Sequence, residues 1–286
     1  MMKRTSYICI LLAGALWGIT GFFFRHLTAL GFGSMEAVVM RIGFAAVLLF
    51  LFLLVKEPSA FRVCLKDLWC MIGAGVACLM MFICYFKAMK YASLAVAVVL
   101  LYTAPGFVVI LSALFFKEKI TRQKLLALAA LFGGCICSSG MLTGSQTITA
   151  CGFLIGVASG FSYSFYSIFS RFALDRGYSP YTITFYAMLF GSVFSLFAVD
   201  LPAMVPKITF SALCYGLGLG FFCCVLPYVL YNTGMRRIET GEAAMLATSE
   251  PVVASFVGVF LFAEPMTVPV VLGVMLIVMG ILIMNH

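Results

Sequence analysis

Long apolar runs alternate with short polar segments along the whole chain. Charged residues, prolines and glycine clusters interrupt these runs at intervals of roughly 20 residues, the length that a helix needs to span a bilayer. The interruptions at 56–67 (KEPSAFRVCLKD) and 116–124 (FKEKITRQK) are the clearest. The pattern predicts ten membrane-spanning helices, at 5–24, 35–55, 68–89, 92–116, 123–142, 150–170, 181–199, 208–232, 241–263 and 267–285.

The composition favours a chain embedded in lipid. Of the 286 residues, 64% are hydrophobic and 10% are charged, whereas soluble domains carry about 25% charged residues. This balance excludes a soluble globular protein and favours an integral membrane protein. The first apolar run lacks a small-residue cleavage site, so residues 5–24 are interpreted as an uncleaved first span rather than a signal peptide.

Lysine and arginine are unevenly divided between the two sets of alternating loops. The set that includes both chain termini holds 13 of the 18, and the other set holds four, Arg25, Lys87, Lys90 and Lys207. Cytoplasmic loops carry the excess of positive charge, so both termini are predicted to be cytoplasmic. The net charge of +8 is explained by these loops, and no nucleic-acid partner is expected.

The two halves of the chain are related by a shift of 146 residues. Residues 85–118 align without a gap over 231–264, and seven of these 34 positions are identical, including Pro105 with Pro251 and Glu118 with Glu264. The alignment predicts two repeats, 1–146 and 147–286, of five helices each. Because five is odd, the two repeats would insert with opposite orientations. Inverted repeats are typical of secondary transporters, which bind substrate near the membrane midplane.

Several motifs, in order along nearly the whole chain, resemble the EamA-type permeases of the drug/metabolite transporter superfamily. They are GALWGITGFFFR (14–25), RIGFAAVLL (41–49), YFKAMKYAS (85–93), SRFALDRGYSPYTITFYAM (170–188) and SEPVVASFVGVFLFAEPMT (249–267). The resemblance implies an all-α membrane protein of ten helices in two inverted five-helix repeats. It also implies export of small metabolites, often amino acids, by alternating access without ATP, and it does not fix the substrate.

Glu250 is the most prominent polar residue within a predicted span, where ionisable groups by default indicate a pathway or a binding site. Its repeat counterpart is Ala104, so the duplication does not explain the carboxylate. We interpret Glu250 as a site for a substrate ammonium group or a proton. An ion pair with Arg41, or a packed neutral carboxyl group, is the alternative; for Arg41 itself a structural anchor or interhelical ion pair is the favoured interpretation.

Pro105 and Pro251 lie near the middle of two predicted spans, 92–116 and 241–263. Proline removes a helical hydrogen bond and kinks a helix, and the freed carbonyl group then needs another partner. We therefore expect symmetric kinks or hinges that also shape the cavity wall, with Ser249 nearby. Close packing is expected for Gly14, Gly18 and Gly21, which share one face of the first span.

The other cavity candidates are hydroxyl, amide and aromatic side chains within spans. Ser159, Tyr163 and Tyr166 share one helical face, although small residues there also suit close helix packing. For Asn232 a packing hydrogen bond is the favoured interpretation. The predicted substrate cavity comprises Glu250, Ser249, Trp17, Tyr102, Ser159, Tyr163, Tyr166, Tyr228 and Asn232.

Other functional classes lack their motifs in this sequence. No histidine lies within the centre of a span, no paired carboxylates share a helix in the core, and no nucleotide-binding P-loop or metal-ligand spacing is present. An enzyme, a cofactor and a metal are therefore not expected, while a channel stays open as an alternative. The sequence favours a monomeric exporter of an amino acid or related metabolite in a bacterial inner membrane, with protons as a possible coupling ion; efflux of hydrophobic or quaternary cations is the alternative.

Overall fold

The computed structural model describes residues 2–142 and 148–284. Within them the chain is helical, without a sheet, and one isolated antiparallel bridge joins Ala92 to Ile148. Eight helical segments are long and apolar enough to span a membrane, so the prediction of an all-helical membrane protein is confirmed. The segments are Lys3–Ala29, Ser34–Lys56, Leu65–Ala88, Leu94–Phe116, Ala150–Asp175, Pro180–Ala198, Phe210–Met235 and Thr240–Phe262.

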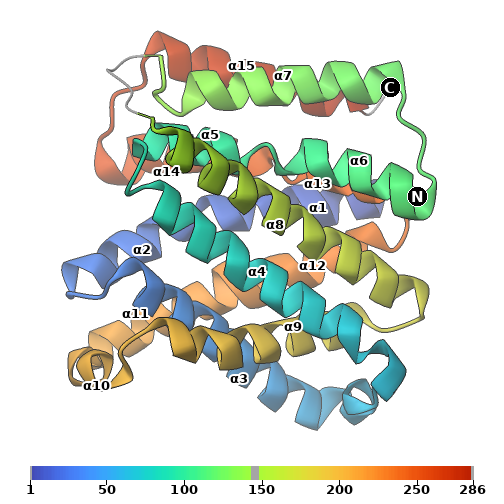
Figure 1. The fold of residues 1–286 in the computed structure, drawn as a ribbon, viewed down its shortest axis with the longest axis vertical. Helices are drawn as coiled ribbons and strands as arrows, with labels where there is room; N and C mark the ends of the chain where they lie inside the picture. Colours follow the sequence, from blue (N-terminus) through green and yellow to red (C-terminus); the bar gives the residue numbers. More distant parts are fainter. Residues whose placement is uncertain (1, 143–147, 285–286) are drawn as a thin grey trace.

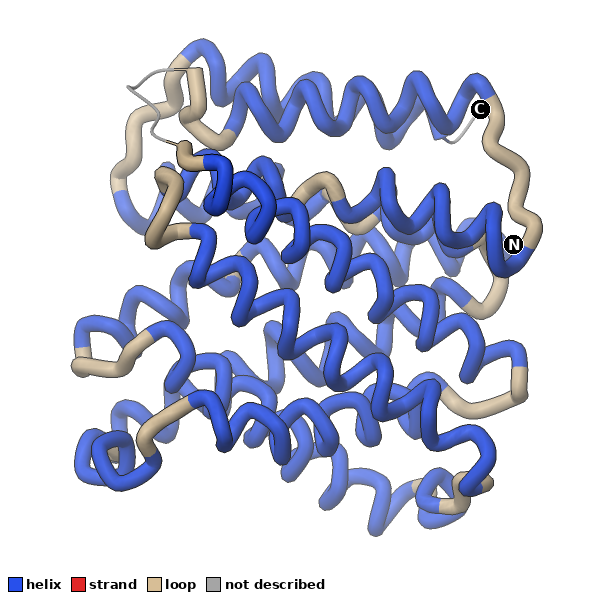
Figure 2. The backbone as a smooth tube through the Cα atoms, in the orientation of Figure 1, coloured by secondary structure: helices blue, strands red, loops and turns tan. Residues whose placement is uncertain are grey.

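The helices run back and forth between two ends of the bundle (Figure 1). We call the end where both chain termini lie the terminal end, and the other the distal end. Figure 2 shows most loops gathered at these two ends. The α-helices of the described chain are α1 Met2–Gly18, α2 Thr20–Ala29, α3 Ser34–Lys56, α4 Leu68–Ala88, α5 Leu94–Leu101, α6 Ala104–Phe116, α7 Arg122–Ser138, α8 Ala150–Asp175, α9 Pro180–Ser195, α10 Leu201–Met204, α11 Phe210–Gly220, α12 Leu226–Met235, α13 Thr240–Leu246, α14 Ser249–Phe262 and α15 Val268–Met284.

Hydroxyl side chains mark where many of the helices begin. Each of five Ser or Thr residues accepts a hydrogen bond from the backbone N–H three positions later, at 3.0–3.4 Å. Such N-caps satisfy a donor that the helix itself leaves unpaired. The capping residues are Ser93 (α5), Thr121 (α7), Thr149 (α8), Ser179 (α9) and Thr209 (α11).

Three of the predicted single spans are divided into two helices, and a fourth contains an irregular turn. The first span breaks between α1 and α2, next to Gly18. The spans that contain Pro105 and Pro251 break just before the proline, so each proline lies in the first turn of a new helix, α6 or α14. A π-helical turn, Phe221–Val225, joins α11 to α12 directly before Pro227. The breaks at the two prolines lie at repeat-related positions.

Several predicted boundaries were wrong by a few residues because charge was taken as a loop signal. The predicted span 150–170 stops short of α8, which continues to Asp175 because Arg171 and Asp175 form an ion pair one helical turn apart, at 2.9 Å. Similarly, α2 continues past Arg25 to Ala29, whereas α7 ends at Ser138, before the predicted residue 142.

The packing divides into a main bundle and an adjacent pair. The helices α4 and α8 lie side by side through the main bundle, and α7 pairs with α15 in a layer at the top of Figure 1. Large apolar side chains face outward over much of the surface; Phe197 and Phe210 are each more than 80% exposed. Such extensive outward apolar surface fits lipid rather than water as the surrounding solvent.

Candidate functional site

A cavity of about 720 Å³ lies inside the bundle. Its walls come from both halves of the chain, mainly from α1, α2, α4, α5, α7, α8, α12 and α14. The inner part is lined by buried Trp17, Arg41 and Tyr228, whereas Leu94 of the lining, at the distal end, is 57% exposed. The lining therefore extends from a buried interior to the distal end. The volume falls within the usual range of small-molecule sites, about 300–1,000 Å³.

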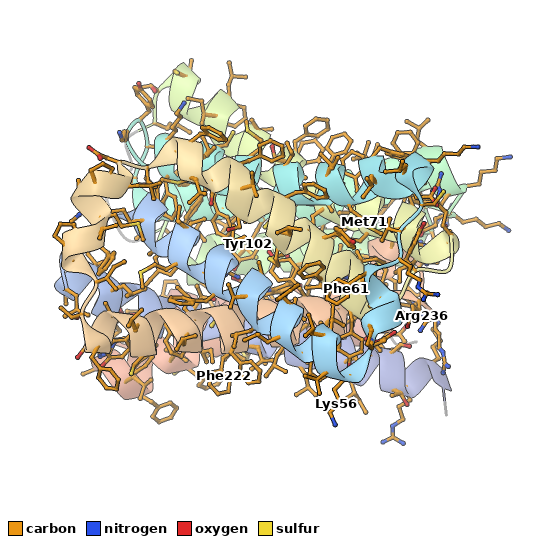
Figure 3. The ribbon with its side chains drawn as sticks, turned by 90° about the horizontal axis from the view of Figure 1, so that it is seen from below. Lys56, Phe61, Met71, Tyr102, Phe222 and Arg236 are labelled. Atoms are coloured by element: carbon orange, nitrogen blue, oxygen red, sulfur yellow. The ribbon has the colours of Figure 1, made fainter. Side chains whose placement is uncertain are left out.

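Glu250 lies in the cavity lining, in the first turn of α14. Tyr102, which follows α5 directly, lines the cavity together with Glu250. The break between α5 and α6 therefore meets the break between α13 and α14 beside the cavity. Figure 3 shows Tyr102 inside the bundle, away from Lys56 and Arg236 at the terminal end.

Arg41, on α3, is the second charged group of the inner cavity and is only 5% exposed. One terminal nitrogen donates to the backbone carbonyl of Cys223 at 2.6 Å, and the guanidinium carbon lies 5.2 Å from the ring centre of Phe82. That carbonyl belongs to the π-helical turn, and Pro227, four residues later, has no N–H to bind it as a regular helix would. Among the described residues Arg41 forms no ion pair with Glu250, and its Nε has no hydrogen-bond partner.

Aromatic rings form much of the inner wall. The ring of Trp17 meets the ring of Tyr228 edge-on, with centroids 5.1 Å apart, and Tyr228 meets Tyr166 in the same way at 4.8 Å. The indole N–H of Trp17 is buried and, within the described part of the chain, has no acceptor. Among the described residues, Trp17 and Arg41 therefore each carry one buried N–H without an acceptor, and both residues line the cavity together with Glu250.

Two glycines of α1 allow this helix to approach the broken span closely. A Cβ atom on Gly18 would lie 2.8 Å from the Glu250 carbonyl oxygen and 2.7 Å from the Cβ of Val253, both too close for real atoms. Gly14 makes an equally close approach to the Ala247 carbonyl, whereas Gly21 has open space around it. The predicted close packing is therefore found at the first two glycines only.

The structure brings five of the nine predicted cavity residues into the cavity lining: Glu250, Trp17, Tyr102, Tyr163 and Tyr228. The other four make packing hydrogen bonds instead. Ser249 donates to the Leu11 carbonyl at 3.1 Å and Ser159 to the Gly156 carbonyl at 2.6 Å. Asn232 donates to the Tyr166 hydroxyl at 2.9 Å and to the Thr184 hydroxyl at 3.1 Å. Polarity and helical spacing did not separate a cavity face from a packing face.

Some cavity-lining residues were not predicted. Phe24, Phe82, Tyr85 and Phe86 add aromatic wall, and at the distal end Arg25 forms an ion pair with Glu264. The sequence contained one signal for the last residue, since Glu118 and Glu264 are identical across the repeat. In the described chain no three potential ligands among His, Cys, Asp and Glu gather to form a metal site.

A helical bundle with an outward apolar surface and a polar group inside a cavity is the architecture of a membrane transport protein. The family model of the EamA-like transporter family matches this chain twice, over residues 4–140 and 150–286. The chain belongs to the EamA-like transporter family and is a membrane transporter.

Two similar proteins are found in an archaeon. A protein of Archaeoglobus fulgidus described as "Uncharacterized transporter" is 31% identical over 282 residues, which is 98% of this chain and 96% of the relative. A second protein of that organism with the same description is 25% identical over 193 residues, or 68% of each chain. A solved structure described as "Crystal structure of protein" superimposes with a TM-score of 0.83 over 98% of this chain and 96% of the other, at 17% identity. That likeness shows a shared fold.

Proposed function

We propose that this transporter exports an amino acid with an apolar or aromatic side chain. The observation that carries the proposal is the set of polar residues that line the inner cavity: Trp17 and Arg41, which carry N–H donors, and Glu250, which carries a carboxylate. A zwitterion complements this set. Its carboxylate would accept from the two donors, and its ammonium group would bind to Glu250.

The walls support an amphipathic substrate rather than a small inorganic ion. Phe82, Phe86 and Tyr163 provide apolar area beyond the charged groups, and an apolar side chain gains free energy by leaving water for such a surface. A substrate whose carboxylate accepts a charge-assisted hydrogen bond from Arg41 would bind more tightly than an apolar molecule of the same size.

Efflux of hydrophobic or quaternary cations is the second candidate. Tyr102 and Tyr163 line the cavity together with Glu250, and aromatic faces beside a carboxylate are typical of sites for quaternary ammonium groups. A cation would leave the donors of Arg41 and Trp17 unsatisfied, and Arg41 would repel it. These two consequences favour the zwitterion.

We propose further that the chain crosses the membrane ten times, as two inverted repeats of residues 1–146 and 147–286. Each of α7 and α15 has 17 residues, or about 25 Å of helix, close to the roughly 30 Å hydrocarbon thickness. With the eight longer segments they make ten. The backbone bonds Glu118 N–H to Ser112 carbonyl and Glu264 N–H to Gly258 carbonyl, 146 residues apart, support the repeat.

Loop charge and the fold support the rest of the proposal. The terminal end holds the larger share of Lys and Arg, including Lys56 and Arg236, which favours a cytoplasmic location for that end of the bundle in a bacterial inner membrane. Alternating access would then expose the cavity first to one side and then to the other. A monomer suffices because one chain supplies both repeats, and Glu250 is the group that would carry a coupled proton.

Reconstitution into liposomes tests the substrate class directly. Vesicles loaded with unlabelled phenylalanine, and separately with leucine, should accumulate the labelled amino acid by saturable counterflow. Two analogues isolate the charges: phenethylamine lacks the carboxylate and 3-phenylpropionate lacks the ammonium group. Both should compete at least tenfold more weakly than phenylalanine, because each leaves one charged cavity group without its partner.

Other outcomes of this assay would contradict the proposal. Equal competition by phenethylamine and phenylalanine would mean that Arg41 and Trp17 do not bind a carboxylate. Saturable transport of tetraphenylphosphonium, with no counterflow of any neutral amino acid, would establish the cation alternative in its place.

A further inference from the structure

At the terminal end, a glutamate and an arginine hold the segment that leads from α12 into α13. Glu118, just after α6, accepts hydrogen bonds from the backbone N–H groups of Thr240, at 2.6 Å, and Gly241, at 3.1 Å. From α8, Arg171 donates to the carbonyl groups of Met235 and Ile238, each at 3.0 Å. Residues 235–241 are thus bound at both sides by charged side chains, and this end is closed.

At the distal end, the repeat-related pair makes a different contact. The counterparts of Glu118 and Arg171 are Glu264 and Arg25, which lie 146 residues away in each case. These two side chains form an ion pair with one another, and the Arg25 guanidinium lies 4.0 Å from the ring centre of Phe262. Both side chains line the cavity and are about half exposed. They do not hold the segment 89–95, which is the counterpart of 235–241.

The backbone around both glutamates nevertheless has the same conformation. The residues before them, Lys117 and Ala263, are the two non-glycine residues with positive φ in the described chain, at 57° and 54°. The N–H groups of Glu118 and Glu264 bind equivalent carbonyls, as described above. The two glutamates therefore leave their helices with the same backbone geometry, and only their partners differ.

The partner segments also differ in accessibility. Thr240 is fully buried, whereas its counterpart Leu94 is 57% exposed beside the cavity. In the described chain no carboxylate accepts a hydrogen bond from the N–H of Leu94 or Ala95. At the terminal end the hydrogen bonds to Thr240 and Gly241 are made, whereas the described chain shows no equivalent bonds to Leu94 and Ala95 at the distal end.

We propose that these two glutamate–arginine pairs are gate-positioning residues that exchange partners during transport. In the state seen here, Glu118 and Arg171 bind residues 235–241 and close the terminal end, while Glu264 and Arg25 bind each other and leave the distal end open. In the other state, Glu264 would accept from Leu94 and Ala95, Arg25 would donate to the carbonyls of Met89 and Ala92, and Glu118 would pair with Arg171. The proposal rests on the inverted-repeat transport cycle proposed above.

The exchange is physically coupled because each glutamate has one set of partners at a time. A carboxylate bound to two backbone N–H groups keeps its charge satisfied by short, charge-assisted bonds. When the gate opens, those bonds break, and the arginine of the other half becomes the replacement partner. Neither state leaves a charge unpaired at the membrane boundary, where an unpaired charge is costly. The states can therefore be close in free energy, as an alternating cycle requires.

Hydrogen–deuterium exchange of the full-length protein in lipid nanodiscs tests the exchange of partners without any knowledge of the substrate. Glu118→Gln removes the charge that closes the terminal end. Amides of residues 240–242 should exchange about tenfold faster, the scale expected for loss of a charge-assisted hydrogen bond, and amides of residues 94–96, at the other end, should exchange more slowly. If Glu118 had only a local structural role, the amides of residues 240–242 would exchange faster and those of residues 94–96 would exchange at an unchanged rate.

A second substitution makes the test two-sided. Glu264→Gln, introduced into the Glu118→Gln variant, should reverse both changes because it removes the charge that closes the distal end. Glu36→Gln is the matched control: Glu36 forms an ion pair with Lys207 at the distal end, at 2.9 Å, but has no glutamate counterpart across the repeat, where Thr182 stands. It should leave exchange at both segments unchanged.

Two results would overturn the proposal. The first is Glu118→Gln with unchanged or faster exchange at residues 94–96. The second is a double variant, Glu118→Gln with Glu264→Gln, in which the amides of residues 94–96 and 240–242 exchange at the same rates as in Glu118→Gln alone. Either result can occur while counterflow of amino acids is intact, so failure of the gates is distinguishable from failure of the proposed function. The reverse also holds. Opposite changes in hydrogen exchange at the two segments, without any amino-acid transport, would support the proposed gates and contradict the proposed substrate.

Discussion

Lys117 and Ala263, which lie 146 residues apart, both adopt a left-handed backbone conformation, with φ of 57° and 54°. Each ends a helix that begins beside a proline, α6 or α14, and each is followed by a glutamate. Residues with a Cβ atom lose about 1–2 kcal/mol in this conformation, so two such turns at matched positions indicate that the geometry itself is needed. Sequence identity at these positions is absent, and only the structure reveals the match.

Replacement of Ala263 by glycine should stabilise the folded protein. Glycine adopts a left-handed conformation without steric cost, and we expect a gain of about 1 kcal/mol in the free energy of unfolding. Thermal unfolding in detergent, followed by circular dichroism, measures this change. Lys117→Gly should behave in the same way at the other end.

Ala113→Gly is the matched control, because Ala113 lies within helix α6. There glycine costs about 1 kcal/mol relative to alanine, so the midpoint of unfolding should fall. If Ala263→Gly also lowered the midpoint, the left-handed turn would not be strained.

The glycines of the first span predict a second contrast. Gly18→Ala should destabilise the protein by about 1–3 kcal/mol, the usual cost of overpacking, since its Cβ would meet the Glu250 carbonyl oxygen and Val253. Gly21→Ala, one turn away, meets no atom within 4 Å and should be neutral or stabilising because alanine favours the helix. Thermal unfolding of the two variants under identical conditions makes the comparison.

The rate of transport should also differ between Gly18→Ala and Gly21→Ala. Gly18→Ala moves α1 away from the cavity residues of α14 and should slow counterflow, whereas Gly21→Ala should transport at the wild-type rate. Equal loss of stability in both variants would mean that helix α1 does not pack on the broken span as described.

Sequence patterns predicted the helical membrane fold well because a spanning helix must be apolar over nearly its whole length. They were less informative about breaks within spans. Pro105 and Pro251 indicated irregular positions, but the break at Gly18 has no comparable signal, and Pro227, which follows the π-helical turn at 221–225, was not used as one. The ends of α8 also depended on a pairing, between Arg171 and Asp175, that a loop rule based on charge cannot anticipate.

The cavity was only partly predictable for a different reason. A buried polar side chain can face either a cavity or another polar side chain, and both choices satisfy its hydrogen bonds. Tyr163 and Tyr166, three residues apart on α8, show this directly: the first lines the cavity and the second bonds to Asn232. The neighbours of each side chain in the folded structure decide between these outcomes, and the sequence pattern does not predict which residues those neighbours are.

Arg41→Lys tests the proposed carboxylate site. Lysine keeps the charge but lacks Nε and the planar guanidinium geometry, so the KM for counterflow of phenylalanine should rise about tenfold or more, as for loss of a hydrogen bond to a charged group. Arg41→Gln, which also loses the charge, should raise it further. In Arg41→Lys the competition by phenethylamine should be unchanged, since that compound has no carboxylate and the positive charge is kept.

Arg176→Lys provides the matched control, because Arg176 forms an ion pair with Asp67 at 2.9 Å outside the cavity lining. Its KM should equal that of the wild type. A KM in Arg41→Lys that also equals the wild-type value would assign Arg41 to structure alone, through its bond to the Cys223 carbonyl.

Glu250→Gln separates substrate binding from proton coupling. Glutamine retains a hydrogen-bond acceptor for a substrate ammonium group but carries no charge, so counterflow of phenylalanine should persist with a KM raised about tenfold. If Glu250 carries the coupled proton, an imposed pH gradient should drive net transport in wild-type liposomes and have no effect on the variant. The measurement is uptake with equal substrate on both sides, with and without the gradient, in matched vesicles.

A gradient response of equal size in both proteins would remove Glu250 from proton coupling, and a KM unchanged from wild type would remove it from ammonium binding. The two readouts are independent, so the carboxylate can be assigned to either role, to both or to neither.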